Sequence, residues 1–211
     1  MTSKATHTSS VAPRSDCVSR ETAERLDCYV AALLRWNRTI NLVSRRDESD
    51  IWERHVADCL QLAKLIPHGT THAIDLGSGA GLPGLVLAIA TGIPFHLIEA
   101  DQRKAAFLRE AGRLTAAPIT VHAGRIERLR LPSAPLVTAR ACAPLATLLA
   151  WAAPLLAADG ICLFPKGRTA DSELTSAALQ WHMRVETLRS RTDADSRIFR
   201  ISDISRFGPD G

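Results

Sequence analysis

The segment from residue 73 to residue 84 constrains the fold of this chain more than any other, because a short apolar strand runs into four glycines and then into an apolar helix. Gly77, Gly79 and Gly81 alternate, so the backbone can take positive φ angles there and expose its amide groups. Pro83 stands where a first helical turn would start, and its missing N–H costs nothing at that position. The segment therefore predicts the strand, turn and helix that open a βαβ unit.

A glycine turn of this kind binds phosphates or nucleosides, and two carboxylates help to decide between them. Asp75 stands two residues before the first glycine. A carboxylate there would repel a pyrophosphate but attract the cationic amino-acid end of a methyl-sulfonium cofactor. Glu99 ends the next apolar strand, where it can accept hydrogen bonds from both ribose hydroxyls. Asp75, Gly77, Gly79 and Glu99 are therefore candidate cofactor-binding residues.

Two other interpretations of the turn remain open from these residues. Gly79, Gly81 and Gly84 also match the dinucleotide spacing Gly-x-Gly-x-x-Gly, and Glu99 would serve NAD as well. Asp75 and the lack of a convincing proton-shuttling Tyr or His disfavour an NAD-dependent oxidoreductase. The turn could instead only pack a helix on a sheet, with Asp75 as a helix cap.

Strands alternate with helices after residue 68, which is typical of a mostly parallel α/β sheet covered by helices. Strands are expected at about 71–76, 94–99, 118–122, 135–140 and 160–164. Two more, near 181–189 and 197–203, leave no room for a crossover helix and predict an antiparallel hairpin at one sheet edge.

The chain divides into three parts by pattern. Residues 1–18 are Ser/Thr-rich without periodicity and are expected to be flexible. Residues 19–68 form a helical extension, with helices at 21–36 and 50–66 and a loop at 37–47. Residues 69–211 form the cofactor-binding domain. In the second helix Arg54 and Asp58 are one turn apart, which predicts a surface ion pair between them.

Charged residues follow several of the expected strands. Ligands in open parallel sheets lie outside the carboxyl ends of the strands. The residues expected to line one crevice there are Asp75, Glu99, Ile126, Glu127, Arg140 and Lys166. Glu127 belongs to a mixed charge run and could be merely solvated, and Lys166 could belong to an ordinary turn. Arg140 lies between apolar stretches, where a bare buried guanidinium would be costly.

Composition narrows the class of protein. Of the 211 residues 46% are hydrophobic, but no apolar run is long enough to span a bilayer, and the first ten residues lack the apolar core of a secretory signal. Five scattered cysteines favour neither a disulfide framework nor a zinc site. We therefore expect a cytoplasmic protein. A net charge of +4 with 22 Arg against 4 Lys permits a nucleic-acid partner, although codon composition explains the arginines equally well.

These residues together resemble the bacterial 16S ribosomal RNA guanine-N7 methyltransferases, the RsmG or glucose-inhibited division protein B (GidB) family. The matching signatures are Trp36-Asn37 with Asn41-Leu42, Arg54-His55-Val56-Ala57-Asp58, the segment from Ile74 to Gly84, Lys104 with Phe107-Leu108, Arg125-Ile126-Glu127, Arg140-Ala141 and Lys166-Gly167. They span about residues 30 to 170, and their combination is specific.

The resemblance implies a class I methyltransferase fold, a Rossmann-like sheet, behind an N-terminal helical extension. It also implies S-adenosylmethionine as the methyl donor and 16S rRNA or the small ribosomal subunit as the partner. We expect the protein to be a monomer. Carried onto this chain, its cofactor contacts fall on Gly77, Leu82, Ile126, Glu127 and Arg140. A non-catalytic RNA-binding protein that keeps this fold as a scaffold remains the rival interpretation.

The implied chemistry needs no general base, because N7 of neutral guanine already carries a lone pair. We expect catalysis to come from holding N7 and the sulfonium methyl in line. No residue is therefore assigned as catalytic. Arg140, Lys166 and Asn41 are the candidates for positioning the guanine, through O6, since N7 must stay free.

Overall fold

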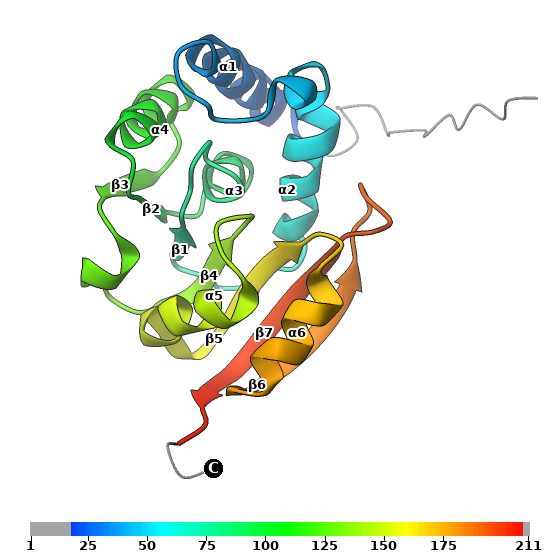
Figure 1. Ribbon diagram of the computed structural model, residues 1–211. Helices are drawn as coiled ribbons and strands as arrows, with labels where there is room; N and C mark the ends of the chain where they lie inside the picture. The colour runs from blue at the N-terminus through cyan, green and yellow to red at the C-terminus, as the bar shows by residue number, and fades with distance from the viewer. Residues whose placement is uncertain (1–17, 209–211) are drawn as a thin grey trace, which may run out of the picture.

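A seven-stranded sheet runs through the computed structural model, which describes residues 18–208. The strands are β1 (Ala73–Leu76), β2 (Phe95–Glu99), β3 (Ile119–Ala123), β4 (Ala134–Ala139), β5 (Leu156–Lys166), β6 (Trp181–Arg189) and β7 (Arg197–Arg206). Their order is β3-β2-β1-β4-β5-β7-β6, and the first five are parallel. Strand β7 runs antiparallel between β5 and β6 (Figure 1). The predicted α/β sheet with an antiparallel C-terminal hairpin is confirmed.

The order of the strands reverses beside β1, which has β2 on one side and β4 on the other. Leu76 is in register with Ile98 of β2 and with Ala139 of β4. The next residue on each neighbour, Glu99 and Arg140, therefore flanks the start of the glycine turn. A reversal of this kind opens a crevice at the carboxyl ends of the strands.

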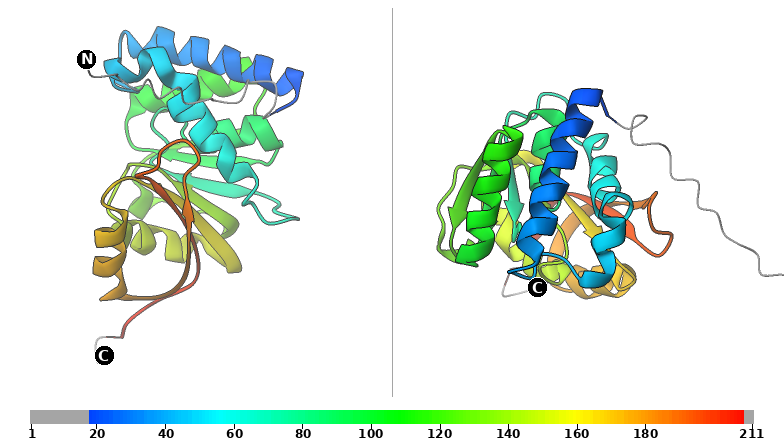
Figure 2. Two further views of the ribbon diagram at one scale, coloured as in Figure 1. Left: turned by 90° about the vertical axis from the view of Figure 1, so that its right-hand side faces the viewer. Right: turned by 90° about the horizontal axis from the view of Figure 1, so that it is seen from above.

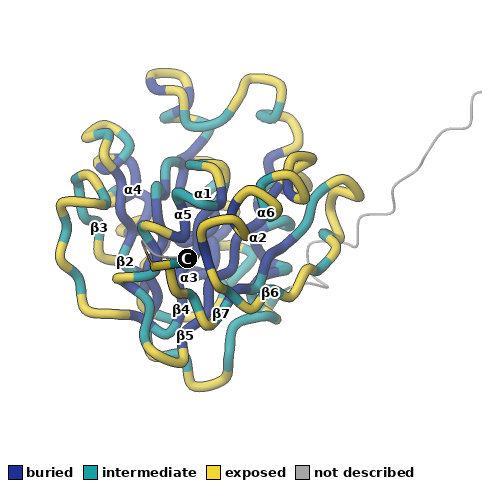
Figure 3. Tube along the Cα trace, turned by 60° about the horizontal axis from the view of Figure 1, so that its bottom comes forward, coloured by how far each residue is buried: buried dark blue, intermediate teal, exposed yellow. Residues whose placement is uncertain are grey.

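Helices cover both faces of the sheet, as predicted (Figures 1 and 2). One face carries α1 (Arg20–Asn37), α2 (Ala57–Ala63), α3 (Gly84–Thr91) and α4 (Gln102–Thr115), and the other carries α5 (Leu145–Ala152) and α6 (Ala170–Ala178). Short 3₁₀ helices lie at Arg45–Asp50, Ile126–Arg128 and Ala153–Leu155. Alternate residues of β2 serve the two cores, with Leu97 under α3 and Ile98 facing the opposite cluster. Figure 3 shows this buried interior as the dark centre of the trace.

Two of the helices on the first face begin at side-chain caps. Asp101 accepts hydrogen bonds from the amides of Arg103 and Lys104, at 2.8 and 3.1 Å, and so caps the start of α4. Ser19 accepts one from the Thr22 amide at the start of α1. Helix α1 then packs against α3 and α4, so the extension shares the core of the sheet domain.

The second part of the extension departs from the prediction. The expected loop ends early, because the Ser44 hydroxyl donates to the Asp47 carboxylate and closes a 3₁₀ helix from Arg45 to Asp50. The expected single helix contains a π-helical turn, Trp52–Val56, before α2 starts, and α2 ends at Ala63. Such a turn needs more residues than an α-helical one.

The predicted ion pair between Arg54 and Asp58 is wrong for the same reason. The wider π-helical turn moves residues four apart out of alignment. Arg54 instead pairs with Asp47 at 2.9 Å, and Asp58 pairs with Arg140 at 3.1 Å. The Asp58 carboxylate therefore joins the extension to the end of β4, and within its own helix it accepts from the Gln61 side chain at 2.7 Å.

Two further predictions concern the N-terminal segment and membrane-spanning helices. The segment expected to be flexible lies outside the described residues except for Val18, which packs against the core. Between residues 18 and 208, none of the helices has the length and apolarity needed to cross a bilayer.

Close packing of α3 on β1 generates a test of the fold. A Cβ added at Gly84 would lie 2.6 Å from Cβ of Asp75 and 2.7 Å from Leu97 Cδ2. We expect Gly84→Ala to lower the free energy of unfolding by about 1–3 kcal/mol in denaturant titrations, because the core is already filled. Gly167→Ala is the control, since its Cβ would meet nothing within 4 Å. Equal stabilities of the two variants would contradict this packing.

Candidate functional site

The glycine turn adopts the left-handed backbone that its sequence predicts. The φ angles of Gly77, Gly79 and Gly81 are +62°, +54° and +88°. A Cβ at Gly77 would lie 2.8 Å from the Cβ of Cys142, but one at Gly79 would meet nothing nearer than a backbone oxygen 3.8 Å away. Gly79 is thus the point at which a ligand can approach the main chain of the turn.

Glu99 holds this turn from the neighbouring strand. Its two carboxylate oxygens accept hydrogen bonds from the amides of Gly79 and Asp101, at 2.8 and 2.7 Å. Each oxygen keeps a further lone pair for an incoming hydroxyl. The Gly124 amide donates to the Glu99 carbonyl oxygen at 2.9 Å, which anchors the segment that leads to the 3₁₀ turn at Ile126–Arg128. The structure thus brings Glu99 close to the segment that carries Ile126 and Glu127.

Asp75 and Leu82 lie beneath the turn rather than on its open side. Asp75 is fully buried, and its Oδ1 accepts a hydrogen bond from the Thr138 hydroxyl at 2.6 Å. Its Oδ2 is buried with no hydrogen-bond partner in the described structure. Burial raises the pKa of Asp75 to about 6, against the opposing effect of the Thr138 bond. Leu82 is 6% exposed and packs into the core between α1 and α3.

Arg140 is paired with Asp58 and His55 of the extension. Such partners are expected, because an unpaired buried guanidinium would be energetically costly. Its Nη1 donates to Asp58 Oδ2 at 3.1 Å, and its Nη2 lies 3.1 Å from His55 Nδ1. A guanidinium can only donate, so Nδ1 accepts and the proton of the neutral imidazole sits on Nε2. Burial, and then the Arg140 charge, lower the pKa of His55 below its usual value.

A cavity of about 800 Å³ opens beside Arg140 at the carboxyl ends of β4 and β5. Lys166 lies in its wall with a side chain 6% exposed, 2.8 Å from the Glu173 carboxylate, and donates to the Ala143 carbonyl oxygen. The structure therefore brings Arg140 and Lys166 to one cavity. Asn41 does not line it and is exposed on the loop after α1.

Sequence reasoning missed the wall that the hairpin loop between β6 and β7 contributes. Thr192 donates to Asp58 Oδ1 at 2.8 Å, and the Gln61 side chain bonds both to Ser190 and to the Arg191 amide. Figure 1 shows this loop rising beside α2. The polar run from Ser190 to Ser196 between two strands was its only signal in the sequence, and such runs usually form solvated turns.

Comparison with known families decides between the interpretations of this site. The family model described as rRNA small subunit methyltransferase G matches residues 22–197. The chain belongs to the rRNA small subunit methyltransferase G family. Two relatives named ribosomal RNA small subunit methyltransferase G support this assignment. The protein of Granulibacter bethesdensis is 56% identical over 194 residues, covering 92% of this chain and 91% of its own. That of Gluconobacter oxydans is 57% identical over 189 residues, covering 90% and 97%.

The resemblance seen in the sequence is thus confirmed. Membership of this family argues against an NAD-dependent oxidoreductase. Solved structures agree on the fold. An O-methyltransferase from Bacillus cereus in complex with SAH has a TM-score of 0.56 at 13% identity, covering 83% of this chain and 90% of that one. A ribosomal protein L11 methylase from Lactobacillus delbrueckii has the same TM-score and identity, covering 72% and 77%. This member of the methyltransferase G family therefore has the predicted class I methyltransferase fold.

The buried carboxylate of Asp75 generates a pH prediction. Its folded pKa of about 6 lies above the ordinary 3.8, so the unfolded chain gives up this proton first. The contribution of Asp75 to stability therefore falls as the pH rises from about 4 to 6. Stability should therefore fall by about 2–3 kcal/mol between pH 4 and pH 7 through this group, and we expect Asp75→Asn to lack this fall when free energies of unfolding are measured at both pH values. The exposed Asp159→Asn is the control. Parallel pH curves for wild type and Asp75→Asn would contradict the burial of a charge here.

Proposed function

We propose that this protein transfers the methyl group of S-adenosylmethionine to N7 of a guanine in 16S ribosomal RNA. The observation that carries the proposal is the open glycine turn, flanked by Glu99 and Arg140, in a chain of the rRNA small subunit methyltransferase G family. The cofactor would supply a methyl group on a sulfonium. A neutral nucleophile can take this methyl group, and the sulfur then leaves as a neutral thioether.

The residues of the crevice suit such a cofactor. Glu99, whose carboxylate accepts from the Gly79 amide, is proposed to accept also from the ribose hydroxyls. The proposed remaining contacts are Gly77, Ile126, Glu127 and Arg140. Leu82, which was expected to contact the cofactor, lies beneath the turn, so we propose that it supports the turn from the core side. Asp75 is enclosed below the turn, so we propose that it acts through its charge, which attracts the cationic amino-acid end of the cofactor without touching it.

We propose the cavity beside Arg140 as the acceptor site. Arg140 and Lys166 are positively charged donors whose charges are balanced by Asp58 and Glu173. Either can bind guanine O6 and leave N7 free to attack. His55 is unsuited as a general base, because its Nδ1 already accepts from Arg140 and its Nε2 carries the proton.

We propose the extension, residues 19–68, as a contact for RNA phosphates beside the methyltransferase domain of residues 69–211. Arg38, Arg45 and Arg46 are exposed there, whereas Arg35 is paired with Glu110. Asn41 lies on the same loop and is proposed as a positioning contact for RNA. We further propose that the protein works as a monomer in the cytoplasm, where ribosomal RNA is assembled into subunits.

Methyl transfer from labelled S-adenosylmethionine to ribosomal RNA tests this function directly. Naked 16S rRNA and small subunits should be offered separately, and the modified base should be mapped at nucleotide resolution. We expect one 7-methylguanosine. RNA binding without methyl transfer to either substrate would favour the scaffold interpretation, and thermal stabilisation by NAD but not by S-adenosylmethionine would favour the oxidoreductase.

Glu99 generates a prediction about cofactor affinity. Glu99→Ala removes the acceptor of two hydroxyl groups, and each charged hydrogen bond contributes about 1.5–3 kcal/mol. We expect the dissociation constant for S-adenosylmethionine to rise at least about tenfold in calorimetric titrations. Glu186→Ala on β6, whose carboxylate pairs with Arg200 at the sheet edge, is the control. Unchanged affinity in Glu99→Ala would move the ribose contact elsewhere.

The neutral nucleophile generates a prediction about pH. We expect the single-turnover rate of methyl transfer, at saturating RNA and cofactor, to be nearly flat between about pH 6 and 9. His55→Ala should leave this profile flat, because the imidazole only supports Arg140. The idea fails if the wild-type rate shows a limb in the histidine range that disappears in His55→Ala, which would identify His55 as the base.

A further inference from the structure

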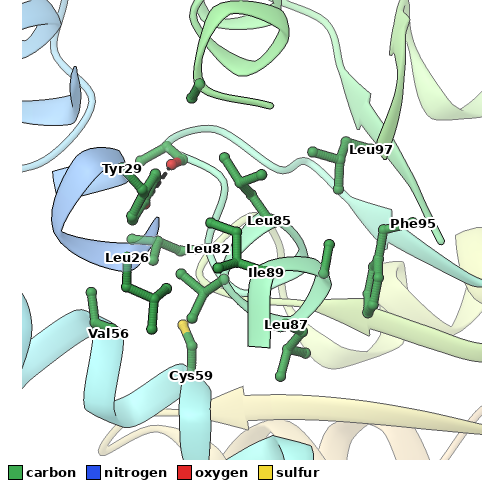
Figure 4. Close-up of a cluster of buried hydrophobic side chains, with 14 of the residues drawn as sticks. Leu26, Tyr29, Val56, Cys59, Leu82, Leu85, Leu87, Ile89, Phe95 and Leu97 are labelled. Carbon is green, nitrogen blue, oxygen red and sulfur yellow. Dashed lines mark hydrogen bonds between the residues drawn. The ribbon is translucent and has the colours of Figure 1, made fainter. Parts of the chain in front are cut away.

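Tyr29 reaches from the helical extension to the glycine turn. It lies in the middle of α1, is 0% exposed, and its hydroxyl donates to the Ala80 carbonyl oxygen at 2.7 Å. Figure 4 shows this bond at one end of the cluster that also contains Leu26, Leu82 and Leu85. The bond joins residues 51 positions apart, so it forms only when the extension is docked on the sheet domain.

The Tyr29 bond fixes the residue next to the part of the turn that faces open space. Gly79 is the residue whose missing Cβ leaves room for a ligand. Its amide is held by Glu99 from β2, and the carbonyl of the following residue, Ala80, is held by Tyr29 from α1. Two side chains from different elements therefore hold the two ends of the Gly79–Ala80 unit.

We propose that Tyr29 is a positioning residue for the cofactor, so that the helical extension helps to build the cofactor site in addition to contacting RNA. The inference rests on the proposed use of S-adenosylmethionine. A glycine turn has many accessible backbone conformations. Fixing one of them before the cofactor arrives removes an ordering cost from binding.

Removal of the hydroxyl alone separates this role from packing. In Tyr29→Phe the ring keeps its place beside Phe107, whose centroid is 6.5 Å away. The Ala80 carbonyl then loses the donor that the described residues supply to it, and a buried carbonyl without a partner favours a different backbone orientation. The change thus reaches the peptide unit between Ala80 and Gly81, which directly follows the open residue Gly79.

Calorimetric titration of the full-length protein with S-adenosylmethionine provides the first test. We expect the dissociation constant of Tyr29→Phe to rise by about three- to tenfold, and the KM for cofactor to rise similarly, while kcat at saturating cofactor stays within about twofold. Thr115→Val is the matched control, because the buried Thr115 hydroxyl donates to a carbonyl oxygen at 2.7 Å in α4.

The outcomes distinguish this inference from the proposed function. If wild type binds and Tyr29→Phe binds equally well while losing thermal stability as Thr115→Val does, Tyr29 is only structural and the inference is overturned. If wild type binds no S-adenosylmethionine, the proposed function fails first.

A second measurement needs no substitution that weakens the fold. Tyr29 is the only tyrosine in the sequence, so growth on 3-fluorotyrosine places a single reporter on this hydroxyl-bearing ring. We expect its ¹⁹F resonance to shift and sharpen on addition of S-adenosylmethionine, and to stay unchanged with NAD. The inference would also be overturned if the chemical shift and line width stay unchanged at saturating S-adenosylmethionine while calorimetry on the same sample confirms binding.

Discussion

The structure depends on the backbone path between β1 and α3. Three glycines within five residues take positive φ angles, which side chains other than glycine adopt only with strain. This path lets α3 pack so closely on β1 that a single methyl group at Gly84 would meet Asp75. It also leaves the main chain bare at Gly79. The same constraint thus builds the core below the turn and the ligand-binding surface above it.

Electrostatic balance organises the other side of the crevice. Arg140 and Lys166 are both largely buried, and each has a carboxylate from another element within about hydrogen-bond distance. A buried cation without such a partner would be strongly destabilising. Because Asp58 also binds the hairpin loop between β6 and β7, one carboxylate holds together three segments that are distant in the chain. The proposed acceptor cavity is therefore preorganised. A reaction at neutral N7 requires N7 and the methyl group to be held in line, and it requires no general base.

Local patterns in the sequence were enough for many elements of the fold. The boundaries of β1, β2 and β3 were predicted within about two residues, because glycine and charged residues punctuate short apolar runs. The pairing of Arg54 failed, because it depends on a π-helical turn whose extra residue has no local signature. The contacts of the hairpin loop with the cavity wall were missed, because their partners, Asp58 and Gln61, lie about 130 residues earlier.

The sequence by itself determined the glycine turn, the acid at the end of β2, the alternation of strands and helices, and the family. These features depend on residues close together in the chain or on signatures shared with relatives. The tertiary structure alone decided which way the buried side chains face. Asp75 faces inward and bonds to Thr138, and the Arg140 side chain bonds to Asp58 and His55. The Tyr29 hydroxyl bonds to the Ala80 carbonyl oxygen. Each of these bonds joins residues more than 50 positions apart, and the packing of helices on the sheet sets their distance.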